Sequence, residues 1–174
     1  MSRRRIASCL ALLGALWLPL SVTHAAARIA VINFDGPDEG FNDPTPVTPV
    51  GGNPATTLGQ ARLNAVQYAA NQVGLLLNTP FTILVRANFN ALGGNSTAAV
   101  LAQATPQFFF REFSGAPRPG TWYASALADL LSGIELNPGN PDIGIQFNKD
   151  IDGGVVLGTS VWYYGLDRNV PTNP

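Results

Sequence analysis

Residues 57–77 carry the clearest periodic pattern in this chain of 174 residues, and the period is that of a helix. Apolar side chains recur every three or four residues, which places them on one side of the helix. They are Leu58, Ala61, Ala65, Ala69, Val73 and Leu76. Thr57 followed by Gln60 has the form of a capping box, and Asn78 marks the expected stop. A helix with such an apolar side must cover another element, so we expect a β-sheet beneath it.

The segments on either side of this helix have strand patterns. Residues 28–34 are apolar on both faces, which predicts an interior strand at the start of the fold. Residues 35–57 have no periodicity and predict a long loop. Residues 81–89 alternate between apolar and polar side chains. This alternation predicts a half-buried strand whose apolar face receives the helix.

Further segments complete the expected fold. In order, they are a short helix over 96–104, an aromatic strand over 107–113, a helix over 122–132 ended by Gly133, a turn over 137–141, a strand over 142–148 and a β-rich run over 155–164. The inner face of the second helix is expected to consist of Leu127, Leu130 and Leu131. Together these elements predict an α+β fold, a twisted mixed β-sheet with one long and one short helix packed on it.

Composition excludes several classes of protein. Charged residues make up 12% of the chain, too few for a nucleic-acid binder or a solvated helical bundle, so no nucleic-acid partner is expected. The 46% hydrophobic content is too high for a chain that is disordered throughout. The 18 Gly and 14 Pro instead indicate long, stiff loops in a single domain.

The N-terminus has the layout of a secretory signal. Three arginines at 3–5 precede an apolar run over 6–22, and small residues around Ala25 offer a cleavage site. The run is shorter than the ~20 apolar residues of a membrane anchor. We therefore expect residues 1–25 to be a signal peptide and residues 26–174 to be secreted or periplasmic, without a membrane contact after cleavage. General secretion is the favoured export route, and the twin-arginine route is the alternative.

Removal of this segment would change the chemistry that the chain can perform. Its only Cys, Cys9, and its only His, His24, both lie within residues 1–25. The remaining chain has seven Lys and Arg against eleven Asp and Glu, a net charge of 7 − 11 = −4. A Ser-His-Asp triad, a Cys-His dyad and a histidine-ligated zinc site are therefore excluded for residues 26–174 alone. No catalytic, cofactor-binding or metal-binding residue is assigned.

Two acidic stretches offer hard oxygen ligands that suit calcium. They are Asp35, Asp38, Glu39 and Asp43 in the long loop, and Asp150 and Asp152 before Gly153. Neither spacing matches a calcium loop, so we favour side chains that hydrogen-bond turn backbone in the first stretch and a hairpin turn in the second. A glycosidase-type carboxylate pair is the least favoured alternative, because the acidic residues show no pairing.

Aromatic residues raise a second hypothesis. The three consecutive Phe at 108–110 could form a ligand platform, but such clusters are more often core, and we favour core. Two Trp-Tyr pairs could instead present a binding surface in a complete, non-enzymatic exported module for peptide or glycan. They are Trp122 with Tyr123, and Trp162 with Tyr163.

Several short stretches resemble a known family when taken together. They are NFDGP at 33–37, EGFND at 39–43, TLGQ at 57–60, RLN at 62–64, GTWYASALA at 120–128, NPDI at 140–143 and WYYGLD at 162–167. These stretches resemble secreted bacterial proteins that carry a protease-associated (PA) domain. The order of the expected elements resembles the N-terminal subdomain of a metzincin-like zinc metallopeptidase.

The resemblance implies a following helix with an H-E-x-x-H motif, whose two His bind zinc and whose Glu acts on the metal-bound water. No stretch of this sequence matches that motif, so no catalytic residue is carried over. We therefore expect residues 26–174 to be a partial, catalytically inactive metallopeptidase-like subdomain. Zinc is expected only if a downstream catalytic helix exists, and the full-length form would take a protein or peptide substrate. The absent subdomain should leave an exposed apolar patch along the sheet or beside Trp162 and Tyr163, and poor solubility.

Overall fold

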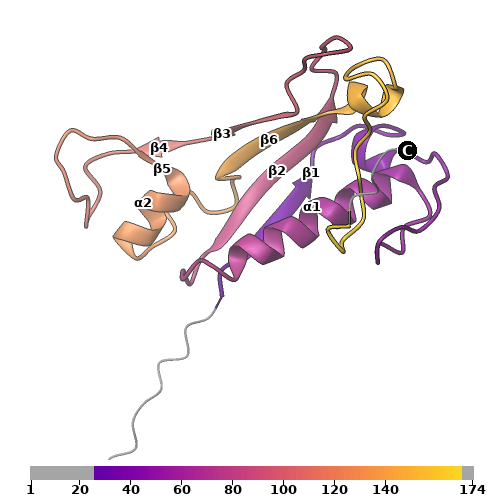
Figure 1. The fold of residues 1–174 in the computed structure, drawn as a ribbon. Helices are drawn as coiled ribbons and strands as arrows, with labels where there is room; N and C mark the ends of the chain where they lie inside the picture. Colours follow the sequence, from indigo (N-terminus) through magenta and orange to yellow (C-terminus); the bar gives the residue numbers. More distant parts are fainter. Residues whose placement is uncertain (1–25, 170–174) are drawn as a thin grey trace, which may run out of the picture.

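The structure is a computed structural model that describes residues 26–169 (Figure 1). Its strands are β1 (Arg28–Asn33), β2 (Thr82–Asn90), β3 (Ala102–Pro106), β4 (Phe109–Phe110), β5 (Tyr123–Ala124) and β6 (Ile143–Asn148). Its α-helices are α1 (Leu58–Gly74) and α2 (Ser125–Ser132), and two 3-10 helices are η1 (Gly40–Asn42) and η2 (Lys149–Gly153). The predicted signal peptide and its cleavage site at Ala25 lie outside the described residues.

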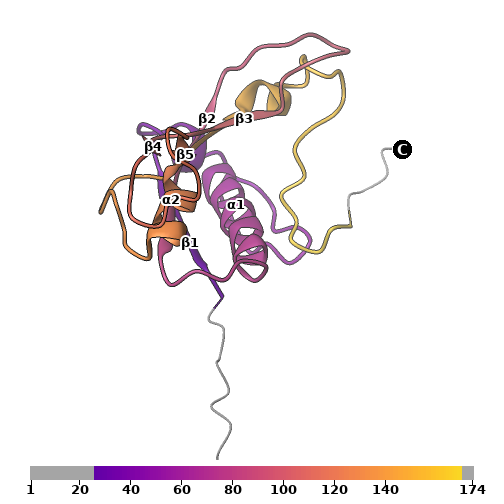
Figure 2. The same cartoon turned by 90° about the vertical axis from the view of Figure 1, so that its left-hand side faces the viewer.

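Four of the strands form one mixed sheet in the order β1-β2-β6-β3. The first three are parallel to one another, and β3 is antiparallel to β6. The chain crosses from β1 to β2 through α1, which lies along one face of the sheet (Figures 1 and 2). A separate two-stranded sheet, β4-β5, lies beside α2 at the far end of β3. The prediction of an α+β fold with a mixed sheet, one long helix and one short helix is confirmed.

The predicted cap of α1 is present, but the helix ends earlier than expected. The Thr57 side chain accepts a hydrogen bond from the backbone N–H of Gln60 at 3.3 Å. At the other end, Ala27 donates its N–H to the carbonyl of Gly74 at 3.0 Å. A side chain at Gly74 would collide with the carbonyl of Ala27. The start of the first strand therefore packs directly against the last turn of α1.

Aromatic rings from three segments form the centre of the core. Phe89 of β2 stacks on Phe147 of β6, with ring centroids 5.0 Å apart, and meets Phe41 of η1 edge to face at 5.4 Å. Val85 and Ala87, on the same face of β2 as Phe89, are also buried. The prediction that residues 81–89 turn one apolar face toward the helix is thus confirmed.

The prediction of an interior strand over 28–34 was wrong. β1 is at the edge of the sheet and pairs only with β2. Apolar residues on both faces of a strand show that other elements cover both faces, and α1 covers one of them here. They do not show whether the strand has one neighbouring strand or two. Period and composition carry no information on the number of neighbouring strands.

Three local predictions in the second half of the chain were also wrong. The short helix expected over 96–104 is absent: the Asn95 side chain accepts from the N–H groups of Thr97 and Ala98 in a turn, and β3 follows. The hairpin expected around 150–152 is η2, since the Asn148 side chain accepts from the N–H of Asp150 and starts a helical turn. The run over 155–164 forms no strand, although its pattern is β-rich.

The second helix agrees with expectation at its end but not on its faces. Gly133 has a φ of 73° and closes α2 in the left-handed conformation. The helix begins at Ser125, after the β4-β5 pairing, and buries Ser125, Ala128 and Asp129. Leu127 and Leu130 are each 46% exposed, so the expected leucine inner face was wrong.

The core interpretation of residues 108–110 was wrong for two of the three rings. Phe108 is 41% exposed and Phe109 is 54% exposed. Among residues 26–169, no helix has the length and apolar character needed to cross a bilayer.

Candidate functional site

An apolar groove of about 420 Å³ runs between α1, the sheet and the segment after η2. Figure 2 shows this last segment, in yellow, running alongside α1. Its lining includes Val66 and Ala70 of α1, Ile143, Ile145 and Phe147 of β6, and Trp162. It therefore lies beside Trp162 and Tyr163, where the sequence leads us to expect an apolar surface.

The groove exists because one helix covers only part of the sheet. α1 contacts β1 and η1, whereas the same face of β6 has no helix above it among the described residues. Parallel strands are normally covered by helices on both faces, because their side chains are apolar on both sides. The strip over β6, where Ile143, Ile145 and Phe147 are only half-buried, is thus an apolar surface with room for a further layer.

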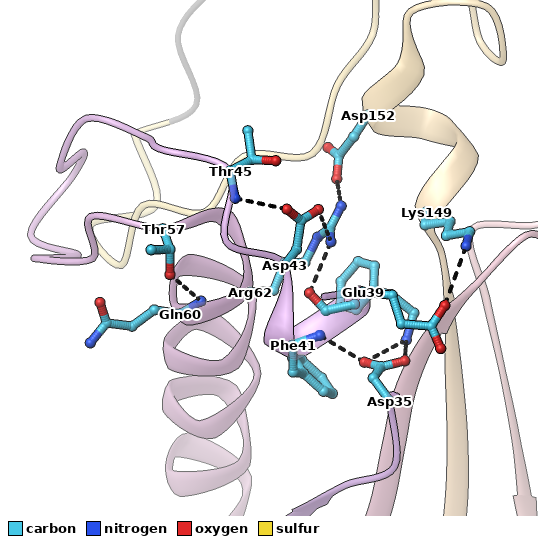
Figure 3. Close-up of polar contacts among 12 residues, drawn as sticks. Asp35, Glu39, Phe41, Asp43, Thr45, Thr57, Gln60, Arg62, Lys149 and Asp152 are labelled. Atoms are coloured by element: carbon cyan, nitrogen blue, oxygen red, sulfur yellow. Dashed lines mark hydrogen bonds and ion pairs between the residues drawn. The ribbon is translucent and has the colours of Figure 1, made fainter. Parts of the chain in front are cut away.

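A buried arginine is among the residues that line the groove, and Figure 3 shows its polar contacts. Arg62 of α1 is 3% exposed and donates from Nη1 to the carbonyl of Gly40 at 2.9 Å. Its Nη2 lies 2.7 Å from Asp152 of η2, and its Nη1 lies 3.3 Å from Asp43. The Tyr164 hydroxyl donates to the same Asp152 oxygen at 2.6 Å. The long loop, α1, η2 and the C-terminal segment are therefore joined at one point.

The electrostatics of this cluster favour a charged arginine and a neutral tyrosine. Burial lowers the pKa of Arg62, but the hydrogen bonds to Asp152 and Tyr164 outweigh it, so the pKa is raised overall. Burial, followed by the nearby charge of Asp152, raises the pKa of Tyr164 far above its usual value. Each of the three guanidinium nitrogens of Arg62 donates within the protein, since Nε also donates to the Tyr164 hydroxyl at 3.3 Å, and these bonds indicate a structural role for the cluster.

Three of the four acidic residues of the long loop accept hydrogen bonds from backbone N–H groups, as predicted. Asp35 accepts from the N–H groups of Phe41 at 2.7 Å and of Phe89 at 3.0 Å. Asp43 accepts from the N–H of Thr45 at 2.9 Å. Glu39 accepts from the N–H of Gly36 at 3.1 Å.

The fold brings the two acidic stretches together, which the sequence did not predict. Asp38, Glu39 and Asp43 line one open hollow with Asp150 and Asp152, at the carboxyl ends of the parallel strands. Arg62 and Lys149 lie in the same hollow, and Lys149 is 3.8 Å from Glu39. The hollow is acidic but contains its own cations.

A third carboxylate group has no sequence signal at all. Asp129, Glu135 and Asp142 each offer an oxygen within 4.8 Å of the others. Asp129 accepts from the N–H of Leu136 at 2.9 Å, and Asp142 accepts from the N–H of Leu84 at 2.9 Å. Burial, and then the charge of Asp129, raises the pKa of Glu135. The spacing of these residues in the sequence matches no motif. They are brought together by the fold, in which the turn over 137–141 lies between Glu135 and Asp142.

The zinc that the family resemblance implies does not fit the residues present. Peptidase zinc is held by nitrogen ligands from His, and residues 26–174 contain neither His nor Cys. The group of Asp129, Glu135 and Asp142 offers only carboxylate oxygens, which suit hard cations such as calcium or magnesium. No zinc-binding residue is therefore assigned.

The outer strand β3 has a free edge, and all five of its residues are exposed. The N–H of Gln107 donates to Asp142 at 2.8 Å, and the N–H of Asn148 donates to Leu101 at 2.9 Å. Both pairs fall in the β3-β6 register, so the odd-numbered residues of this stretch bond to β6.

The even-numbered residues of β3 consequently point their backbone groups away from the sheet, because successive residues of a strand alternate. Ala102 and Ala104 present N–H and C=O outward. Pro106 occupies the next outward position, where a missing N–H costs no pairing within the sheet. The small side chains leave this edge open to a further strand.

The two Trp-Tyr pairs do not form one surface. Trp162 lines the groove and donates from Nε1 to the carbonyl of Asn148 at 2.8 Å. Trp122 adjoins the β4-β5 hairpin and is 59% exposed. Figure 1 shows the hairpin at the opposite end of the sheet from η2. A single aromatic binding surface built from both pairs is therefore wrong.

Comparison of the chain with protein-family models, curated proteins and solved structures finds no match. Assignment of a function therefore depends on the groove, the free edge of β3 and the set of ligand atoms.

Proposed function

We propose that this chain is the substrate-side subdomain of an exported, zinc-metallopeptidase-like protein of the PA-domain-containing kind. It binds an extended peptide along β3 and accepts a helix in the apolar groove. The chain itself binds and orients, because residues 26–174 supply no imidazole and no thiol to attack a peptide bond.

The observation that carries the proposal is the uncovered apolar strip over β6. Ile143, Ile145 and Phe147 line it from the sheet, and α1 bounds it on one flank. Neighbouring helices pack at about 8–10 Å between axes, so an amphipathic helix beside α1 is the natural occupant. The H-E-x-x-H helix implied by the resemblance would be amphipathic, with its zinc ligands on the side away from the groove.

The free edge of β3 supports the substrate side of the proposal. Two outward N–H groups, at Ala102 and Ala104, and three outward C=O groups can pair with an extended peptide. Main-chain pairing of this kind gives affinity without strong sequence preference. That property suits a protein that handles protein or peptide substrates.

A direct test uses Trp162 as a reporter of the groove. Trp122→Phe leaves Trp162 as the only Trp of residues 26–174. The probe is a synthetic amphipathic helix of 17 residues, the length of α1, with Leu on one face and H-E-x-x-H on the other. We expect saturable binding that changes Trp162 fluorescence, and no binding of a scrambled peptide with the same composition.

Two matched variants locate the binding. Ile145→Glu places a charge in the groove and should abolish the response. Leu130→Glu places the same charge on the exposed face of α2 and should leave it intact. Absence of helix binding to the parent chain, or equal effects of both variants, contradicts the proposal.

A second candidate is a complete, non-enzymatic exported module for peptide or glycan, and the exposed rings of Phe109 and Trp122 favour it. Reading the genomic DNA beyond codon 174 in all frames separates the two. An H-E-x-x-H motif shortly downstream supports the peptidase-like subdomain, and an unrelated gene after a clean stop supports the module.

A further inference from the structure

The hairpin β4-β5 has two different faces. Phe109 pairs with Ala124 and Phe110 pairs with Tyr123. Because side chains alternate along each strand, Phe109 and Arg111 share one face with Trp122. The Arg111 guanidinium lies 4.9 Å from the centre of the Trp122 ring, as that register requires. We call these three residues the hairpin face.

The other side of the hairpin is packed within the protein. Tyr123 meets Phe113 edge to face with centroids 5.4 Å apart, and its hydroxyl accepts from the N–H of Arg118 at 3.1 Å. Phe110 is half-buried. The two most exposed rings of this region, Phe109 at 54% and Trp122 at 59%, thus share the hairpin face, whereas Phe108 on the other side is 41% exposed.

The charge on this face has no acidic partner within the described residues. No carboxylate of residues 26–169 lies within 4.0 Å of Arg111, whereas Arg62 and Lys149 both have one. An arginine stacked on an indole keeps its N–H edge free to bind a carboxylate. In a chain with a net charge of −4 after residue 25, this is an exposed cation beside two exposed rings.

The hairpin face also continues the line of the open strand. β4 begins three residues after β3 ends, and Figure 1 shows the two strands following one another in one line. An extended peptide advances ~3.3 Å per residue. A peptide that pairs along β3 and continues in the same direction therefore arrives beside Phe109 within a few residues. Trp, Tyr and Arg are the residues that most often contribute strongly to the binding of protein partners.

From these features we propose that the hairpin face binds the flanking part of a peptide ligand, an apolar side chain followed or preceded by a carboxylate. The apolar side chain packs against Phe109 and Trp122, and the carboxylate accepts from Arg111. A glycan is disfavoured, because the guanidinium already covers one face of the indole. This assignment rests on the proposed function, in which the same peptide pairs with β3.

The test compares three synthetic peptides that share a Thr-Val-Thr-Val-Thr-Val strand and end in Leu-Asp, Leu-Asn or Leu-Lys, each tail placed at either terminus. With the purified chain, we expect the Asp tail to bind about ten-fold more tightly than the Asn tail, as for a charge-assisted hydrogen bond. The Lys tail should bind most weakly. Arg111→Gln should remove the preference for Asp, and Arg111→Lys should retain part of it.

The controls separate this inference from the proposed function. Arg118→Gln removes one positive charge, as Arg111→Gln does, but at a position outside the hairpin face. This variant should keep the preference for the Asp tail. Ala104→Pro removes one outward N–H of β3 and should weaken all three peptides alike, without changing the preference. Loss of the preference in Arg111→Gln together with no effect of Ala104→Pro supports the hairpin face and contradicts the β3 site.

Two results overturn the inference. One is equal binding of the Asp and Asn tails to the parent chain, or a preference that survives Arg111→Gln. The other is binding of an oligosaccharide such as cellohexaose or chitohexaose that is lost in Trp122→Ala, with no binding of any peptide. Circular dichroism and thermal melting of each variant identify those that have lost the fold.

Discussion

Arg62 and Asp152 meet at 2.7 Å although they are 90 residues apart in the chain. The contact joins the first turns of α1 to η2, and Tyr164 adds the C-terminal segment to the same carboxylate. The segment with Trp162 and Tyr163, which forms one wall of the groove, is therefore fixed to the cluster through Tyr164.

Arg62→Met should destabilise the protein strongly. The substitution keeps the length of the side chain but leaves Asp152 and Asp43 without their cation. Breaking a buried pair in this way costs about 3–5 kcal/mol, measured as the free energy of unfolding in urea. Lys149→Met breaks the exposed contact with Glu39 at 3.8 Å and should cost less than ~1 kcal/mol. Equal losses in the two variants would contradict a structural role for the buried cluster.

Tyr164 should make the protein sensitive to alkali. Its pKa is raised on folding, so above pH 10 the unfolded chain loses the phenolic proton while the folded chain keeps it. Stability is then complete below pH 10 and falls as pH rises, by up to about 1.4 kcal/mol per pH unit. In Tyr164→Phe this part of the pH dependence should vanish between pH 9 and 11.5. Parallel stability curves for the two proteins would show that the hydroxyl does not matter.

Gly74→Ala should destabilise the protein, although alanine normally favours a helix over glycine by about 1 kcal/mol. The added methyl group would strike the carbonyl of Ala27, where the first strand packs on α1. We expect a loss of about 1–3 kcal/mol. Gly153→Ala meets nothing within 4 Å and should change stability by less than ~0.5 kcal/mol. A stabilised Gly74→Ala variant would contradict the close contact.

The groove should make the isolated chain bind apolar dyes and associate with itself. Ile145→Gln puts a polar side chain on the sheet in the groove and should lower anilinonaphthalene sulfonate fluorescence and raise solubility. Its stability should change by no more than ~1.5 kcal/mol, since the position is only half-buried. A parent chain that binds no dye and stays monomeric at high concentration would contradict an exposed apolar groove.

Sequence patterns predicted the elements whose signals are local. The Thr57 cap, the alternation that buries Phe89 and the closing Gly133 all depend on neighbours within a few residues. The β3 strand was missed because residues 96–104 have weak local preferences, and pairing with β6 decides their structure. Leu127 and Leu130 were misplaced because α2 packs through its small residues on a two-stranded sheet.

The candidate site depends on contacts that are distant in the chain, and sequence reasoning found little of it. The meeting of Arg62 with Asp152 and the grouping of Asp129, Glu135 and Asp142 have no sequence signature. The aromatic pairs were recognised as candidates, but their separation to opposite ends of the sheet follows from topology. The absence of His and Cys after residue 25, in contrast, is a property of the sequence itself and limits the chemistry in any fold.

The most direct measurement follows one extended peptide through both binding and cleavage. The peptide with the Leu-Asp tail is incubated with the purified chain and added zinc, its affinity is measured by fluorescence anisotropy, and its mass is followed by mass spectrometry. We predict reversible binding that Ala104→Pro weakens, with the peptide intact throughout. Fragments whose rate of formation scales with the concentration of the pure chain would contradict the account, as would a parent chain that does not bind the peptide.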